Sequence, residues 1–183
     1  MTAPYYCWET PSPVGPLLLG GDGEALSLLR FQGGRRAARP PGHWRCERAP
    51  FAAVIAQLDE YFAGARREFD LELSLRGSGF QREVWQALRR IPYGTTRAYG
   101  ELARELGHPG GARAVGVANG SNPVAIIVPC HRVIGADGSL TGFGGGLPVK
   151  RALLQLEGAA CVHDLFSPPG GSAPGRGLHA AGS

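Results

Sequence analysis

Hydrophobic and polar positions in the first part of the chain follow two different periods. Residues 5–31 contain short apolar runs separated by Pro and Gly turns, and Gly-Gly-Asp-Gly at 20–23 indicates a hairpin. After a polar loop at 32–50, helical spacing and a stop at Gly64 predict a helix with Phe51, Val54, Ile55, Leu58 and Phe62 on its apolar face. Alternation then predicts a half-buried strand over 68–77 that turns Phe69, Leu71, Leu73 and Leu75 to one side.

The middle of the chain is predicted to be helical. Ser78 and Gln81 form a capping box in front of a helix over 80–91. A second helix is predicted over 97–106, with Thr95 or Thr96 as its N-cap. A third helix, over 111–120, follows after a tight turn that contains Gly, so this pair describes a helix-turn-helix.

The third predicted helix has an unusual composition. Apart from Arg113 it consists mostly of Gly, Ala and Val, whereas a helix that reads the major groove usually carries long polar side chains. One interpretation is close approach to the minor groove with Arg113 as a probe. The other is tight packing in the core with Arg113 in solvent, and charge and size alone favour this second interpretation.

Cys130 stands in a setting that favours reactivity. The apolar residues 124–128 predict a short strand, which Pro129 ends because proline has no backbone donor. Neighbours on an extended chain point apart, so a bridging water is needed for His131 to act as base and to make the thiolate at neutral pH. Asn122 is suited to hold backbone groups of the turn. The alternative is a buried, inert cysteine, which is the commoner fate of this residue type.

Composition limits the class of protein. The 183 residues are 43% hydrophobic, and no apolar run approaches the ~20 residues of a membrane span. The first ten residues lack a basic segment followed by an apolar one, so we expect no secretory signal and a cytoplasmic location. Zinc bound by Cys7, His43 and Cys46 is one metal alternative, although this spacing matches no compact finger.

Positive charge is concentrated around Cys130. The chain carries a net charge of +4, and residues 76–151 hold ten basic residues against four acidic ones. Such a basic surface suits a polyanion such as nucleic acid. An arginine-rich solvated surface explains it equally well, since 18 of the 19 basic residues are Arg.

Three segments then carry a family resemblance: IPYGTTRAYGELA at 91–103, GARAVGVANGSNPVAIIVPCHRVIG at 111–135 and LTGFGGGLPVKRALLQLEG at 140–158. They resemble the O6-alkylguanine-DNA alkyltransferases, also called methylated-DNA–protein-cysteine methyltransferases. The resemblance implies an α+β protein with a ribonuclease-H-like α/β domain at 1–76. It further implies a mostly helical domain with a helix-turn-helix at 77–160, and residues 161–183 are expected to be a flexible tail.

The resemblance also implies an activity. The family transfers the alkyl group of O6-alkylguanine in DNA, and by implication of O4-alkylthymine, irreversibly to its own cysteine in a single turnover. Cys130 corresponds to that acceptor, His131 to the water-linked base and Glu157 to the carboxylate that orients it. Asn122 resembles the residue that braces the turn, and Tyr99 the phenol that protonates the departing guanine.

Further positions are implied at the DNA and in the pocket. Arg113 resembles the finger that replaces the extruded nucleotide in the base stack. The other implied DNA-binding residues are Ala112, Ala114, Gly116, Thr95 and Thr96, and the implied pocket residues are Val133, Phe143 and Gly144. The family usually has tyrosine where this chain has Phe143, and because only about 1 kcal/mol of hydrogen bonding is lost, we expect activity to be retained.

The expected partner is double-stranded DNA that contains O6-alkylguanine, with no cofactor, metal, membrane or obligate protein partner. Three rivals remain. A non-catalytic lesion-binding relative would lack the acceptor, which Cys130 argues against. A helix-turn-helix regulator would need a ligand or dimerisation element, and a cysteine hydrolase would need an oxyanion hole and turnover.

Overall fold

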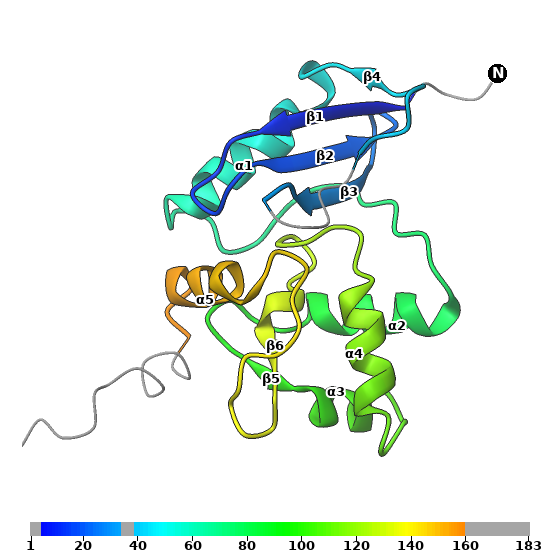
Figure 1. The fold of residues 1–183 in the computed structure, drawn as a ribbon, viewed down its shortest axis with the longest axis vertical. Coiled ribbons are helices and arrows are strands. Elements are labelled where there is room, and N and C mark those ends of the chain that lie inside the picture. The colour runs from blue at the N-terminus through cyan, green and yellow to red at the C-terminus, as the bar shows by residue number, and fades with distance from the viewer. Residues whose placement is uncertain (1–4, 34–38, 160–183) are drawn as a thin grey trace, which may run out of the picture.

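The computed structural model describes residues 5–33 and 39–159. The predicted flexible tail at 161–183 lies outside these residues. The first part of the chain forms a sheet with one helix, and the second part forms a group of helices stacked against it (Figure 1).

The N-terminal part is a four-stranded sheet in the order β3-β2-β1-β4. Strands β1 (Tyr6–Thr10), β2 (Leu17–Gly21) and β3 (Leu26–Phe31) are antiparallel neighbours, and the short β4 (Arg45–Cys46) runs parallel to β1. The predicted strands and the hairpin at 20–23 are therefore confirmed. A 3₁₀ turn, η1 (Ala49–Phe51), leads into helix α1 (Ala52–Phe62), where the sequence predicts a helix.

The predicted strand over 68–77 is wrong. This segment is extended but meets the sheet at a single bridge between Leu26 and Leu73. Two different segments share the free edge of β3. Leu26 exchanges hydrogen bonds with residues 72 and 74, while Leu29 exchanges them with residues 123 and 125. Neither partner segment therefore builds a ladder. The predicted alternation still holds, since the four apolar side chains are half-buried.

The predicted strand over 124–128 is wrong for the same reason. After one bridge between Leu29 and Val124 the chain turns, and Val128 N donates to Val124 O at 3.0 Å. Ile126 has φ 69°, a costly conformation for a β-branched residue. Its side chain is buried, so tertiary packing holds the turn in place. Cys130 follows directly in a single 3₁₀ turn, η2 (Cys130–Arg132).

The helices of the second part agree with the sequence prediction except at one cap. Helix α2 (Gly79–Arg89) starts with the predicted capping box, and α3 (Tyr99–Glu105) and α4 (Ala112–Gly120) form the helix-turn-helix. Neither predicted threonine caps α3. The cap is Ala98, whose N–H donates to the Glu101 carboxylate at 3.0 Å, because β5 (Arg97–Ala98) first pairs with β6 (Val133–Ile134).

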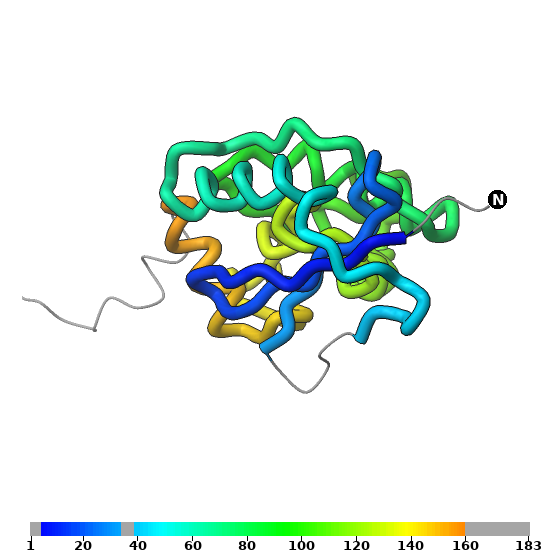
Figure 2. Tube along the Cα trace, turned by 90° about the horizontal axis from the view of Figure 1, so that it is seen from above, coloured from blue at the N-terminus to red at the C-terminus, as the bar shows by residue number. Residues whose placement is uncertain are grey.

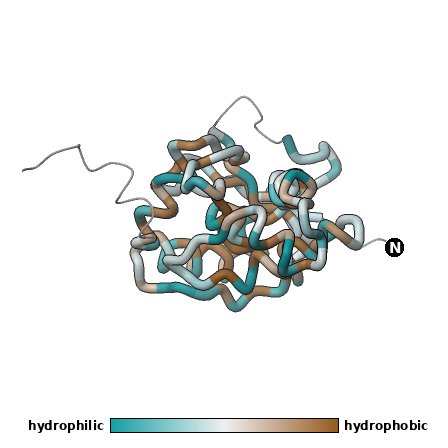
Figure 3. Tube along the Cα trace, turned by 90° about the horizontal axis from the view of Figure 1, so that it is seen from below, coloured by the Kyte–Doolittle hydropathy of each residue, from teal (hydrophilic) through white to brown (hydrophobic). Residues whose placement is uncertain are grey.

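Helix α5 (Leu147–Leu156) lies below α1 and ends next to Glu157 (Figure 1). One cluster of buried hydrophobic side chains contains residues from both parts of the chain. Seen from above, the N-terminal strands and α1 cover the middle of the helical part (Figure 2). Hydrophobic stretches run through the centre of the body (Figure 3). None of the helices in the described ranges is long and apolar enough to cross a membrane.

Candidate active site

The turn that precedes Cys130 is held by one side chain. Asn122 Nδ2 donates to Val128 O at 2.8 Å, and Asn122 Oδ1 accepts from Val124 N at 3.1 Å. The amide thus joins both ends of the turn, as a bracing residue would. The backbone of β3 fixes the other side, since Leu29 N donates to Pro123 O at 2.9 Å.

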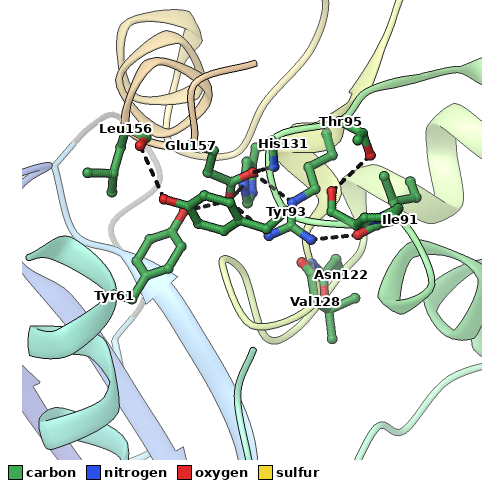
Figure 4. A network of polar contacts seen from close by, with 12 residues as sticks. Tyr61, Ile91, Tyr93, Thr95, Asn122, Val128, His131, Leu156 and Glu157 are labelled. Carbon is green, nitrogen blue, oxygen red and sulfur yellow. Dashed lines mark hydrogen bonds and ion pairs between the residues drawn. The ribbon is translucent and has the colours of Figure 1, made fainter. Parts of the chain in front are cut away.

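A buried carboxylate organises the residues that follow Cys130. Glu157 Oε1 lies 2.8 Å from His131 Nε2, and both side chains are fully buried. Arg132 binds both carboxylate oxygens through Nε at 2.8 Å and a terminal nitrogen at 2.9 Å. Tyr61 OH, from α1, donates to Oε1 at 2.7 Å (Figure 4). Burial disfavours the charged carboxylate, but the hydrogen bonds from His131 and Arg132 outweigh it and lower the pKa of Glu157 to about 2.

These contacts fix the tautomer of His131. A carboxylate accepts only, so Nε2 carries the proton and Nδ1 holds the lone pair. Burial, and to a smaller extent Arg132, lower the pKa of His131, which keeps the ring neutral. Nδ1 is buried and makes no hydrogen bond to any described residue. His131 therefore presents one ring nitrogen as a proton acceptor.

The Cys130 thiol is protonated at rest. Burial raises its pKa, against the hydrogen bond from Asn122 and the positive charge of Lys150, which lower it. Only 6% of the residue is exposed. The thiol therefore needs a proton acceptor at the moment of reaction, which is the role that the sequence predicts for His131.

Lys150 is a second buried cation near Cys130. Its Nζ donates to Val133 O at 2.6 Å and to Thr141 O at 2.9 Å, and it lies 5.9 Å from the centre of the Tyr99 ring. Burial lowers the pKa of Lys150 to about 8, against the opposing effect of Cys130. Val133 is fully buried and its carbonyl oxygen accepts from Lys150, but it does not line the cavity at Cys130, so its place in the substrate pocket stays a prediction.

A cavity of about 110 Å³ opens at Cys130. The predicted pocket residues Phe143 and Gly144 line it, and the Phe143 ring packs 5.4 Å from the ring of Phe31. The N-terminal sheet supplies another part of the lining through three consecutive residues of β3: Leu29, Arg30 and Phe31. An aromatic ring at 143 thus has a packing role that does not need a phenol.

Tyr99 is half-buried at the start of α3 and faces α4. Burial raises its pKa, which a hydrogen bond to Thr141 opposes and a nearby Cys130 reinforces. The phenol therefore stays protonated and available as a donor. A Cβ at Gly116 would lie 3.8 Å from the Tyr99 ring, in ordinary contact, so Gly116 faces Tyr99 at a distance that alanine would also allow.

The helix-turn-helix leaves one face of α4 in solvent. Arg113 and Ala114 are exposed, Ala112 and Gly116 are half-buried, and Val117 is 69% exposed. Val115 and Ala118 point into the core. The core-packing interpretation thus holds for one side of α4. The other side presents Arg113 among small residues, and the minor-groove interpretation stays a prediction. Thr95 is exposed in the turn before α3, and Thr96 is half-buried.

The zinc alternative lacks a complete ligand set. Cys7 Sγ and Cys46 Sγ lie 3.2 Å apart, but His43 is not grouped with them. No three His, Cys, Asp or Glu side chains gather as a metal site anywhere in residues 5–33 and 39–159.

Comparison with protein families decides the assignment. Residues 5–75 match the 6-O-methylguanine DNA methyltransferase ribonuclease-like domain, and residues 79–159 match the DNA-binding domain of the same proteins. The chain belongs to the 6-O-methylguanine DNA methyltransferase family. The predicted family and the predicted two-part α+β fold are confirmed.

Relatives of this methyltransferase family are similar over most of their length. A methylated-DNA–protein-cysteine methyltransferase of Mycobacterium bovis is 56% identical over 84% of this chain and 93% of its own length. A protein of the same name from Methanosarcina acetivorans is 51% identical over 81% of this chain and 95% of its own. The crystal structure of Mycobacterium tuberculosis OGT in complex with DNA has a TM-score of 0.79 and 52% identity, and covers 88% of this chain and 99% of the other.

Several residues of the methyltransferase site escaped sequence analysis. Arg132, Lys150 and Tyr61 are buried polar groups that contact the predicted residues, and β3 lines the cavity. Arg132 follows His131 directly, and Lys150 lies in the matching segment at 140–158. Charged residues inside or next to the family motifs were therefore the signal that could have found both. No local signal marks Tyr61, which reads as one more apolar residue of an amphipathic helix.

Proposed function

We propose that this protein repairs DNA by moving the alkyl group of O6-alkylguanine irreversibly to Cys130, as a methylated-DNA–protein-cysteine methyltransferase. The observation that carries the proposal is the arrangement at the cavity. The buried thiol of Cys130 lines it, and the adjacent His131 is held neutral by Glu157, with Nδ1 as proton acceptor.

The thiol gives up its proton during the transfer. His131 Nδ1 accepts it through a bridging water, and the Glu157 carboxylate stabilises the imidazolium that forms. The sulfur then attacks the alkyl carbon, a C–S bond forms, and the C–O bond to the guanine breaks. Lys150 favours the anionic sulfur, as its effect on the Cys130 pKa shows.

The leaving guanine takes the electron pair of the C–O bond. Tyr99 donates a proton to the guanine ring, and its burial keeps the phenol protonated until then. Gly144 lines the cavity, and its backbone N–H is the expected donor to O6. The product at Cys130 is a thioether, which is a poor leaving group, so the protein is consumed after one turnover.

We infer that the exposed side of α4 meets DNA. A stacked guanine shields O6, so the nucleotide must rotate out of the duplex, which costs a few kcal/mol and less at a damaged pair. Arg113 then fills the gap in the base stack, while the small residues Ala112, Ala114 and Gly116 allow close backbone approach. Thr95 and Thr96 lie at the turn before α3, where a DNA phosphate is the expected contact.

Mass spectrometry of the intact protein tests this function. We expect incubation with a duplex that contains O6-methylguanine to add one methyl group to each chain, and peptide mapping to place it on Cys130. Lesion removal should stop at one equivalent of protein. Repair of many lesions per chain, or repair with an unmodified Cys130, would contradict the proposal and favour a hydrolase.

Cys130→Ala is the control for this experiment. The variant should take up no methyl group, and its affinity for the duplex should be close to that of the wild type, since Cys130 lies in the cavity and not on the exposed side of α4. Methylation of the variant at another residue would show that the acceptor is wrongly assigned.

A further inference from the structure

The N-terminal part of the chain contributes a side chain to the proton-transfer residues. Tyr61, near the end of α1, is fully buried and stands 96 positions from Glu157 in the sequence. Its OH donates at 2.7 Å to Glu157 Oε1, the same oxygen that accepts the Nε2 proton of His131 at 2.8 Å. Figure 4 shows the phenol reaching Glu157 from the side of α1.

Packing leaves the Tyr61 hydroxyl little freedom. Three aromatic rings surround the phenol: Phe62 at 5.3 Å, Phe69 at 5.4 Å and Tyr93 at 6.2 Å between ring centres. Burial and the neighbouring Glu157 charge raise the pKa of Tyr61, so the phenol remains a donor. The other titratable or charged groups that face His131 and Glu157 are Arg132, Tyr93, Lys150 and Cys130.

We propose that Tyr61 is a positioning residue for the transfer reaction: it sets the basicity of His131 through Glu157. This inference rests on the proposed function. Three donors share Oε1, from Tyr61, His131 and Arg132, and the Tyr61 hydrogen bond withdraws negative charge from the oxygen that stabilises the imidazolium. Without the phenol, Oε1 attracts the His131 proton more strongly and the pKa of the imidazolium rises. On the acidic limb of the pH profile, a larger share of His131 is then already protonated and cannot act as base.

The test is the pH dependence of single-turnover methyl transfer in Tyr61→Phe. We expect the acidic limb of the pH–rate profile to shift to higher pH by about half to one unit. At a fixed pH on that limb, methyl transfer is then about 3- to 10-fold slower than in the wild type. At high pH the rate should return to that of the wild type. A purely structural role would lower the rate by the same factor at every pH, and that result would overturn the proposal.

Tyr93→Phe is the matched control. It removes a phenol from the same aromatic cluster, but this hydroxyl donates to the backbone oxygen of Leu156 at 3.1 Å and not to the carboxylate. The acidic limb of the pH–rate profile of Tyr93→Phe should therefore lie at the same pH as in the wild type. If the wild type itself fails to methylate Cys130, the proposed function is wrong. If the wild type is active and Tyr61→Phe shows an unshifted limb, only the role of Tyr61 is wrong.

A separate observation concerns two thiols at the far edge of the sheet. Cys7 of β1 and Cys46 of β4 are direct partners in the parallel pairing, and their sulfur atoms lie 3.2 Å apart. A disulfide bond is ~2.05 Å long, so a shift of about 1 Å joins them. β4 has only two residues and lies at the sheet edge, where Arg45 N donates to Tyr5 O at 2.8 Å and Glu47 N to Cys7 O at 3.1 Å.

We infer that Cys7 and Cys46 form a reversible disulfide when the protein meets a hydroperoxide. The exposed Cys46 thiolate attacks one peroxide oxygen and becomes a sulfenic acid. The O–O bond breaks, and the other oxygen leaves as an alkoxide, or as hydroxide from hydrogen peroxide, and takes a proton from water. The Cys7 sulfur then attacks the Cys46 sulfur, the S–O bond breaks, and the hydroxide takes the Cys7 proton and leaves as water. The two thiols are oxidised to a disulfide, and one hydroperoxide is reduced to an alcohol and one water, or to two waters in the case of hydrogen peroxide.

Among the three cysteines that the structure describes, the environments favour this pair over the methyl acceptor. Cys7 is 1% exposed and Cys130 6%, whereas Cys46 is open to solvent. Burial, followed by the contact with Cys46, raises the pKa of Cys7 to about 11, so Cys7 resolves the sulfenic acid and does not react first. Oxidation at Cys46 should thus spare Cys130 and leave methyl transfer intact.

Peptide mapping after mild hydrogen peroxide treatment tests the pair. We expect the wild type to lose two hydrogen masses, a cross-link between the peptides of Cys7 and Cys46, reversal by dithiothreitol, and full methyl uptake while oxidised. Cys46→Ser should show no cross-link under the same treatment. A cross-link that involves Cys130 or Cys161, or sulfinic acid at Cys46 without any cross-link, would overturn the inference.

Discussion

Replacing Glu157 with glutamine is expected to slow methyl transfer by about a hundredfold or more, the scale of general acid–base catalysis. The carboxylate accepts from His131, Arg132 and Tyr61 in a site closed to solvent. An amide in its place has one acceptor oxygen and turns N–H groups toward donors. The tautomer of His131 is then no longer fixed, and its imidazolium loses the negative charge beside it.

The same substitution is expected to destabilise the fold. Arg132 remains buried without a counter-ion, and breaking a buried ion pair costs about 3–5 kcal/mol. Urea unfolding at pH 7 measures this loss. Glu105→Gln is the matched control, because Glu105 pairs with Arg90 at 2.9 Å in solvent, where an ion pair contributes at most about 1 kcal/mol. Equal urea midpoints for Glu157→Gln and Glu105→Gln would contradict the role of Glu157 as the buried counter-ion of Arg132.

The effect of Glu157→Gln on stability should depend on pH. The folded-state pKa of Glu157 is lowered to about 2 from an ordinary value of 4.5, so its stabilisation is present above pH 4.5 and is lost as the pH falls toward 2. The shift corresponds to about 3 kcal/mol. The difference in the free energy of unfolding between wild type and variant should therefore become smaller as the pH falls from about 5 to 2. A constant gap would show that the carboxylate is not held ionised by its partners.

Arg113→Ala is expected to reduce repair of duplex DNA by about 10- to 100-fold, while transfer from the free base O6-methylguanine stays unchanged. Extruding a nucleotide costs a few kcal/mol, and each 1.4 kcal/mol is tenfold in rate. Arg113 is the one long basic side chain of α4, and it is exposed among small residues. If Arg113 fills the space that the extruded nucleotide leaves in the base stack, its loss slows repair of duplex DNA. The free base needs no extrusion and is therefore unaffected.

Single-turnover rates with saturating protein at fixed salt separate this role from affinity, because phosphate contacts make binding depend on salt. Arg48→Ala makes the same change of charge at an exposed position of the N-terminal part and should leave both rates unaltered. Equal slowing of duplex and free base by Arg113→Ala would refute the stacking role and indicate damage to the site itself.

The sequence was a reliable guide where local chemistry decides the structure. The Ser78–Gln81 capping box, the hairpin at 20–23 and the helices at 52–62 and 112–120 depend on neighbours within a few residues. The two wrong strands, at 68–77 and 124–128, have β-like patterns, but they compete for one edge of β3. A strand needs a partner, and pairing along an edge is a property of the whole molecule.

For the candidate site, residue order alone indicates the chemistry: the PCHR segment, the glutamate 26 residues after His131 and the small-residue helix with Arg113 identify the family and its reaction. The environment of these groups depends on the three-dimensional fold. The fold buries Cys130 so that its thiol stays protonated, and it brings Tyr61 to Glu157 and β3 to the cavity. The physical reason is that pKa values and cavity walls depend on distance in space, which residue order does not specify for contacts between distant parts of a chain.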